Sequence, residues 1–243
     1  MKKLLPIPPL IIGIAFIMFF TSGISSFNYF VSLGAYPTFY EVVVSQTNDI
    51  NIFAYSIFFA FAIILASYNK NQFNVEKTEF KKLKQSFCLA FITLLAFFIA
   101  NILAYFLLTF SLNLFDAQAN MLATYYDNTA GVFWGSLLLI LVRLMFFTYL
   151  FFSMSDFFGE SLAFIVLILI NYFDRYLIIV KSTVSPPLLC MGTYSLYDYT
   201  FTSYIEFTPN YLKHLVFWII AFGIVLVLNY LVRRIKSCKK SYS

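Results

Sequence analysis

The sequence predicts an all-α membrane protein that crosses the bilayer six times and keeps both ends in the cytoplasm. The prediction rests on the composition, on six apolar runs of spanning length, and on a one-sided distribution of lysine and arginine. Of the 243 residues, 61% are hydrophobic and only 11% are charged, whereas soluble domains carry roughly 25% charged residues. A water-facing surface needs more polar cover than this chain can provide, and a bilayer removes that need.

Six apolar runs are long enough to cross a membrane. A hydrocarbon core about 30 Å thick requires about 20 helical residues, each rising about 1.5 Å. Backbone groups in lipid must be bonded internally, and the runs show no strand-like alternation, so helices are expected. The whole chain, 1–243, is expected to form one transmembrane domain. The predicted spans are 10–33, 52–68, 87–112, 131–152, 161–180 and 214–232.

The first run also resembles a signal peptide, because Lys2 and Lys3 precede an apolar stretch and small residues. The apolar stretch continues past Phe27 to Leu33, which favours a span that is retained.

Lysine and arginine lie mainly on one side of the predicted spans. Twelve of the 16 occur before the first span, between the second and third, or after the sixth. The opposite loops carry only Lys181 and Lys213 as basic residues and several acids, including Glu41. Basic loops stay in the cytoplasm, so both ends are expected there. The abundance of Phe, Tyr, Ile, Asn and Lys suggests an AT-rich genome, and we therefore expect a bacterial plasma membrane.

Two connections are long enough to have structure of their own. In the cytoplasmic segment 69–86, Phe80, Leu83 and Phe87 recur at helical spacing with lysines between them. This pattern predicts an amphipathic helix along the membrane face. Two interpretations of the segment are open: it is a solvated basic loop held near anionic lipid, or it is a docking element for a cytoplasmic partner. The outer segment 181–213 is rich in proline and aromatic residues, which predicts short re-entrant helices that act as an interfacial anchor or as a cap over a pathway.

A few charged residues lie within or beside the spans. Arg143 falls in the middle of the fourth span, where an arginine costs about 2.5–3.5 kcal/mol. Asn101 and Asp174 are its candidate partners, in a structural contact between helices or along a substrate path. Asp156 and Glu160 lie at the cytoplasmic turn before the fifth span. The interpretations there are helix capping, by Ser155 or Asp156, and a second contact with a cytoplasmic partner.

Familiar catalytic and cofactor motifs are missing from the sequence. There is no G-x-x-x-x-G-K-[ST], HExxH or GxSxG motif. His214 is the single histidine, and the three cysteines are far apart. The net charge of +5 lies mostly beside apolar runs, so nucleic acid is not an expected partner. We expect no catalytic, cofactor-binding or metal-ligating residues in this chain, and no enzymatic activity of its own.

The overall layout of the chain resembles a known family. The features that carry the resemblance are the six spans, the basic link 69–86, the short turn 153–160, the aromatic outer segment and the basic tail RRIKSCKK. The chain is similar to the permease subunit of type-2 ATP-binding-cassette exporters. The resemblance covers nearly the whole chain and is one of architecture more than of motif. One departure is that only about nine residues precede the first span, whereas many members carry a longer amphipathic helix there.

The resemblance implies a dimer of permeases, identical or different, bound to two cytoplasmic ATPase subunits that hold ATP and Mg²⁺. The first and fifth spans would form the dimer face and the lateral substrate entrance. Members of this size resemble bacteriocin-immunity permeases or exporters of amphipathic peptides such as phenol-soluble modulins. The residues matching the family's ATPase-docking (coupling) helix are Glu76, Glu79, Phe80, Lys81, Leu83 and Lys84.

Two alternatives stay open. A secondary transporter would need coupling-ion ligands near the midplane, for which only Arg143 and Asp174 are available. A non-transporting immunity or scaffold protein would place its activity in the outer segment 181–213.

Overall fold

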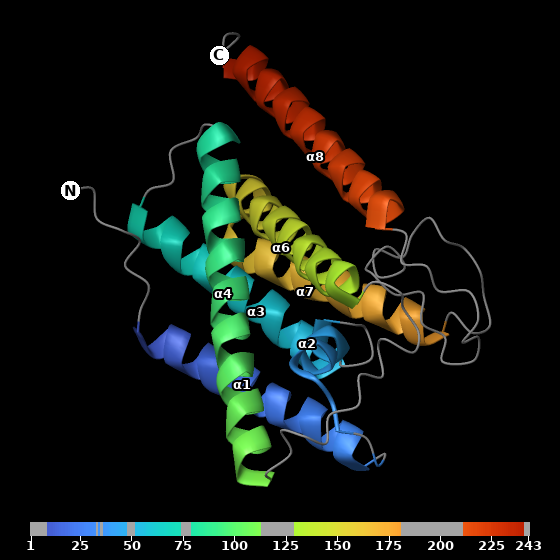
Figure 1. Ribbon diagram of the computed structural model, residues 1–243. Helices are drawn as coiled ribbons and strands as arrows, with labels where there is room; N and C mark the ends of the chain where they lie inside the picture. Colours follow the sequence, from blue (N-terminus) through green and yellow to red (C-terminus); the bar gives the residue numbers. More distant parts are fainter. Residues whose placement is uncertain are drawn as a thin grey trace.

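The computed structural model describes residues 9–32, 34, 36–47, 52–73, 79–112, 129–180 and 211–240 (Figure 1). This part of the chain contains helices and no strand, which confirms the predicted all-α class. Each predicted apolar run coincides with a helix. The helices are α1 (Pro9–Ser32), α2 (Phe39–Thr47), α3 (Ile52–Phe73), α4 (Glu79–Leu112), α6 (Thr129–Phe158), α7 (Glu160–Val180) and α8 (Tyr211–Lys240).

Among the described residues, α1, α4 and the Phe133–Phe158 part of α6 are long and apolar enough to cross a membrane. Their outer surfaces are apolar as well. On α4 the exposed apolar side chains recur every three or four residues and so form a stripe along the helix. Apolar stripes of this length on an outer surface indicate contact with lipid. The stripe consists of Phe87, Phe91, Leu95, Ile99, Leu103, Phe106, Leu107 and Phe110.

The central helix of the bundle is α6. It contacts α2, α3, α4, α7 and α8, and most of its described side chains between Phe133 and Phe152 are buried. A helix that is apolar on all sides is stable only where neighbours or lipid surround it. The core therefore lies around α6, with Phe19, Phe97 and Phe147 among its fully buried members.

The contact between α1 and α4 depends on small residues. Ser22, Gly23 and Ser26 are buried on α1. A Cβ on Gly23 would lie 2.7 Å from Asn101 Oδ1 and 3.1 Å from Ala104 Cβ, so only glycine lets the two helices come this close. Helices in lipid gain little from hydrophobic burial against each other, and close packing of this kind holds them together.

The short helix α2 differs from the prediction, because the sequence pattern places Glu41 and its neighbours in an outer loop. Thr38 begins it with a capping box: the backbone N–H and Oγ1–H of Thr38 donate to Glu41 Oε2 at 2.6 and 2.9 Å. The N–H of Glu41 donates back to Thr38 Oγ1 at 3.4 Å. The ring of Phe39 then packs against Phe98 and Phe133, which places α2 inside the bundle beside α4 and α6.

Two predictions about the connections are wrong. Residues Glu79 to Ser86 do not form a separate helix along the membrane face, because they are the first turns of the continuous α4. Ser155 and Asp156 do not cap the fifth span, because α6 continues to Phe158 and only Gly159, at a φ of 85°, separates it from α7. The positive φ lets the chain reverse within one residue. The predicted re-entrant segment up to residue 210 lies outside the described residues.

Candidate functional site

Five helices bring polar side chains together at one end of the bundle, which we call the polar end. The polar end is formed by the end of α3, the start of α4, the end of α6, the start of α7 and the C-terminal half of α8. Three of the predicted site residues, Glu79, Asp156 and Glu160, belong to it. Its members are Ser67, Lys70, Glu79, Lys82, Tyr149, Ser153, Ser155, Asp156, Glu160 and Asn229.

The central charge of the polar end is Lys82. Its side chain is only 1% exposed, and Nζ lies 2.5 Å from Asp156 Oδ2 and 3.8 Å from Glu79 Oε1. Lys70 on α3 approaches the same aspartate, with Nζ 3.6 Å from Oδ1, and donates to Ser155 Oγ at 2.6 Å. A buried ammonium is tolerated only when paired with opposite charge. The ion pairs thus join α3 and α4 to the last turn of α6.

A chain of hydrogen bonds extends from the same place to α8. Tyr149 on α6 donates its hydroxyl proton to Glu79 Oε2 on α4. Asn229 on α8 donates from Nδ2 to Tyr149 Oη at 3.1 Å and to Ser153 Oγ at 2.8 Å. At the start of α7, Glu160 Oε2 accepts from Ser67 Oγ of α3 at 3.2 Å. Together with the contacts of Lys70, these bonds connect the five helices of the polar end.

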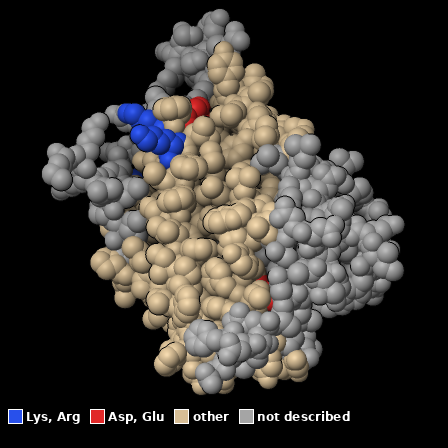
Figure 2. All heavy atoms as spheres, viewed as in Figure 1, with Lys and Arg blue, Asp and Glu red and all other residues tan. Residues whose placement is uncertain are grey.

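The outward surface of the polar end is basic and aromatic. Phe80 in the first turn of α4 is 77% exposed, and Phe158 at the end of α6 is 62% exposed. Lys81 and Lys84 are also exposed, whereas Leu83 is half-buried. On the face seen in Figure 2, the described Lys and Arg atoms gather near the start of α4, and most of the described surface below them is uncharged. The predicted residue Glu76 lies outside the described residues.

Arg143 lies elsewhere, between α6 and α8. It is 3% exposed, and its Cζ is 5.9 Å from the ring centroid of Phe147 and 5.6 Å from that of Trp218. Aromatic faces attract a guanidinium, more strongly where water is excluded. The sequence could not identify Trp218 as a neighbour, because it comes from a helix far along the chain.

Asn101 contributes to a different contact, between α2 and α4. Its Oδ1 accepts from Gln46 Nε2 at 2.5 Å, and its Nδ2 donates to the Phe97 carbonyl at 3.0 Å. Asn101 therefore makes a polar contact between helices, with Gln46, and its pairing with Arg143 stays a prediction. Asp174 belongs to α7, and its side chain lies outside the described residues.

Sequence reasoning missed Lys70, Tyr149 and Asn229 as members of the polar end. A signal was present for Asn229, which interrupts the apolar run VLVLNYLV, since a polar residue within a span usually faces another helix. In the part of the chain that the structure describes, no three His, Cys, Asp or Glu side chains lie together as metal ligands would.

No protein-family model, no curated protein and no solved structure matches this chain.

Proposed function

We propose that this chain is the permease subunit of an ATP-binding-cassette exporter in a bacterial plasma membrane, with six spans and both ends inside. A second permease completes the pathway, and a separate ATPase, which binds ATP and Mg²⁺, docks at the polar end. One observation carries the proposal. The start of α4, which the resemblance assigns to the ATPase contact, meets the α6–α7 corner, the candidate second contact with a cytoplasmic partner, and the Lys82–Asp156 ion pair joins them.

The direction of the helices supports this placement. The polar-end contacts join the ends of α3 and α6 to the starts of α4 and α7, so consecutive long helices alternate in direction (Figure 1). The exposed lysines Lys81 and Lys84 lie at that same end. Under the positive-inside rule this end faces the cytoplasm, where a soluble ATPase can reach it.

The outer surface of the helices supports an amphipathic or hydrophobic substrate, with a peptide first and a lipid or drug second. Such a substrate partitions into the bilayer and enters from the side, at the entrance that the first and fifth spans would form, and both α1 and α7 expose apolar side chains. Arg143 on α6 and Asp174 on α7 are the candidates for polar positions along the pathway.

The test is capture of the ATPase by the tagged permease, purified in mild detergent from its native cells. We expect Phe80→Ala to reduce the co-purified ATPase at least tenfold, because an exposed aromatic anchor at an interface commonly contributes about 2 kcal/mol or more. Phe91→Ala is the matched control, since Phe91 is also exposed on α4 but lies three turns further along, in the apolar stripe.

Other outcomes would contradict the proposal. Wild-type permease that captures no ATPase, or Phe80→Ala that captures as much as wild type, would argue against it. Transport that follows a proton gradient and survives ATP depletion would favour a secondary transporter. Protection against a toxin that survives loss of every ATPase partner would favour a non-transporting immunity or scaffold protein.

A further inference from the structure

We infer that Tyr149 is a positioning residue that couples the ATPase-docking end to α8. The inference rests on the proposed function, because it assigns a route by which ATPase movement reaches the last helix.

The hydroxyl group of Tyr149 is a junction between three helices. A phenol has one proton to donate and lone pairs with which to accept. Its proton goes to Glu79 in the first turn of α4, and its oxygen accepts from Asn229 on α8. Both Tyr149 and Asn229 are buried. Because linked hydrogen bonds polarise one another in a low-dielectric interior, displacing Glu79 changes the bond to Asn229 as well.

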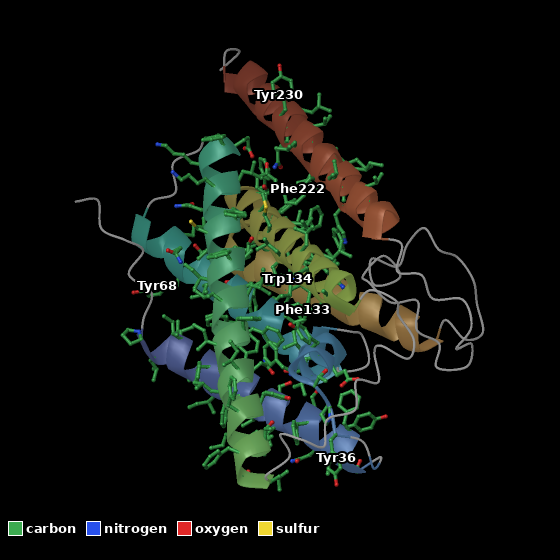
Figure 3. The ribbon with its side chains drawn as sticks, viewed as in Figure 1. Tyr36, Tyr68, Phe133, Trp134, Phe222 and Tyr230 are labelled. Atoms are coloured by element: carbon green, nitrogen blue, oxygen red, sulfur yellow. The ribbon has the colours of Figure 1, made fainter. Side chains whose placement is uncertain are left out.

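The hydrogen bond between Asn229 and Tyr149 helps to fix the position of α8 on α6. The described side chains of α8 pack mainly on α6, through Trp218 and Phe222, and most of the others between Val216 and Val232 are apolar and exposed. Figure 3 shows Phe222 on the side of α8 that faces α6 and Tyr230 turned away from α6. Beside the ring contacts of Phe222, the bonds from Asn229 to Tyr149 and Ser153 hold α8 in one register against α6.

A force on the start of α4 therefore has a short path to α8. Glu79 is adjacent to the exposed Phe80, the residue that we expect to insert into the ATPase. Movement of that turn shifts the carboxylate, the carboxylate shifts the Tyr149 hydroxyl, and Asn229 follows. Since α8 lies at the edge of the described bundle, its shift changes the side of the bundle that faces lipid (Figure 1).

The experiment uses the co-purified complex in proteoliposomes, with nitroxides at Ile99 on α4 and Val227 on α8, both exposed. The distance between them is measured by pulsed EPR without nucleotide and after trapping with ADP and vanadate, and ATP hydrolysis is measured on the same samples. We expect the α4–α8 distance to change on trapping in wild type. In Tyr149→Phe and Asn229→Leu we expect at least half of that change to be lost, measured on the complexes that have captured the ATPase. Tyr230→Phe is the matched control, because Tyr230 is exposed on α8 and points away from α6.

The outcomes separate the two proposals. If wild type captures no ATPase, the proposed function fails. If the ATPase is captured but the distance does not change in wild type, or changes as much in Tyr149→Phe as in wild type, this inference fails and the proposed function stands. A Tyr149→Phe complex that melts at a lower temperature but keeps the full distance change assigns Tyr149 a structural role only, and this also overturns the inference.

Discussion

Lys82 Nζ on α4 lies 2.5 Å from Asp156 Oδ2 on α6, at the point where both helices reach the polar end. The lysine is almost fully buried, while the aspartate keeps 30% of its side chain exposed. The pair therefore has one desolvated charge that depends on its partner and one charge that water also stabilises. This asymmetry predicts that the two ends of the pair respond differently to substitution.

Asp156→Asn should destabilise the protein more than Lys82→Met. Breaking a fully buried ion pair costs about 3–5 kcal/mol, and we expect about 2–3 kcal/mol here, because Glu79 Oε1 still lies 3.8 Å from the lysine. Lys82→Met removes the buried charge itself, so the double variant should be more stable than Asp156→Asn alone. Reversible unfolding in mixed micelles measures both. Lys84→Met, at an exposed lysine, should change stability by less than about 0.5 kcal/mol. Equal losses in the two single variants would show that the pair is not asymmetric.

Gly23→Ala should loosen the α1–α4 contact. The added Cβ would lie 2.7 Å from Asn101 Oδ1, and moving that amide strains its bond to Gln46. Overpacking of this kind costs about 1–3 kcal/mol. At Gly13, on the same helix, an added Cβ meets nothing within 4 Å, so Gly13→Ala should leave stability unchanged or raise it by up to about 1 kcal/mol. Melting temperatures in detergent compare the two, and equal effects would contradict the close approach at Gly23.

Thr38→Ala should weaken α2 through the loss of its cap. The substitution removes the hydroxyl that donates to Glu41 Oε2 and accepts from the Glu41 N–H. Caps of this kind are worth about 1 kcal/mol, which a melting curve can resolve. Thr21→Ala serves as the comparison, since the Thr21 hydroxyl bonds only to the Met18 carbonyl at an exposed site and should have an effect below about 0.5 kcal/mol. A Thr38 variant as stable as the Thr21 variant would show that the capping box does not hold α2.

The two tryptophans should report lipid contact differently. Trp134 is 61% exposed and Trp218 is fully buried. In vesicles of brominated phospholipid, a Trp218→Phe protein keeps the exposed indole and its fluorescence should be strongly quenched. A Trp134→Phe protein keeps the buried indole and should be quenched much less. The reverse order would mean that the surface around Trp134 does not face lipid.

Sequence reasoning found the long helices because each is a continuous apolar run, and length with hydropathy is a strong local signal. It missed α2, since nine residues are too few for a periodic pattern, although the spacing of Thr38 and Glu41 in TFYE is that of a capping box. It separated 69–86 from the third span because its lysines suggested an interface. In the structure, α4 already begins at Glu79, and Lys82 is turned inward.

The contacts within the polar end could not be predicted from the sequence, for a physical reason. Glu79, Asp156 and Glu160 were singled out individually as cytoplasmic contacts. The contacts between them depend on how separate helices are rotated against each other. This holds for the pairing of Lys82 with Asp156 and for the bonds of Tyr149 to Glu79 and Asn229. Apolar periodicity does not fix that rotation when lipid and neighbouring helices are equally apolar.

The single-residue corner at Gly159 also bears on how the protein enters the membrane. The corner contains Asp156 and Glu160 but no lysine or arginine, so it lacks the basic residues that normally retain a loop in the cytoplasm. Its counter-charges, Lys70 and Lys82, belong to α3 and α4, which are synthesised earlier. In the proposed six-span topology, α6 and α7 have one residue between them and would insert as a hairpin. The lysines already held by α3 and α4 would then supply the orientation that the corner's own sequence does not encode.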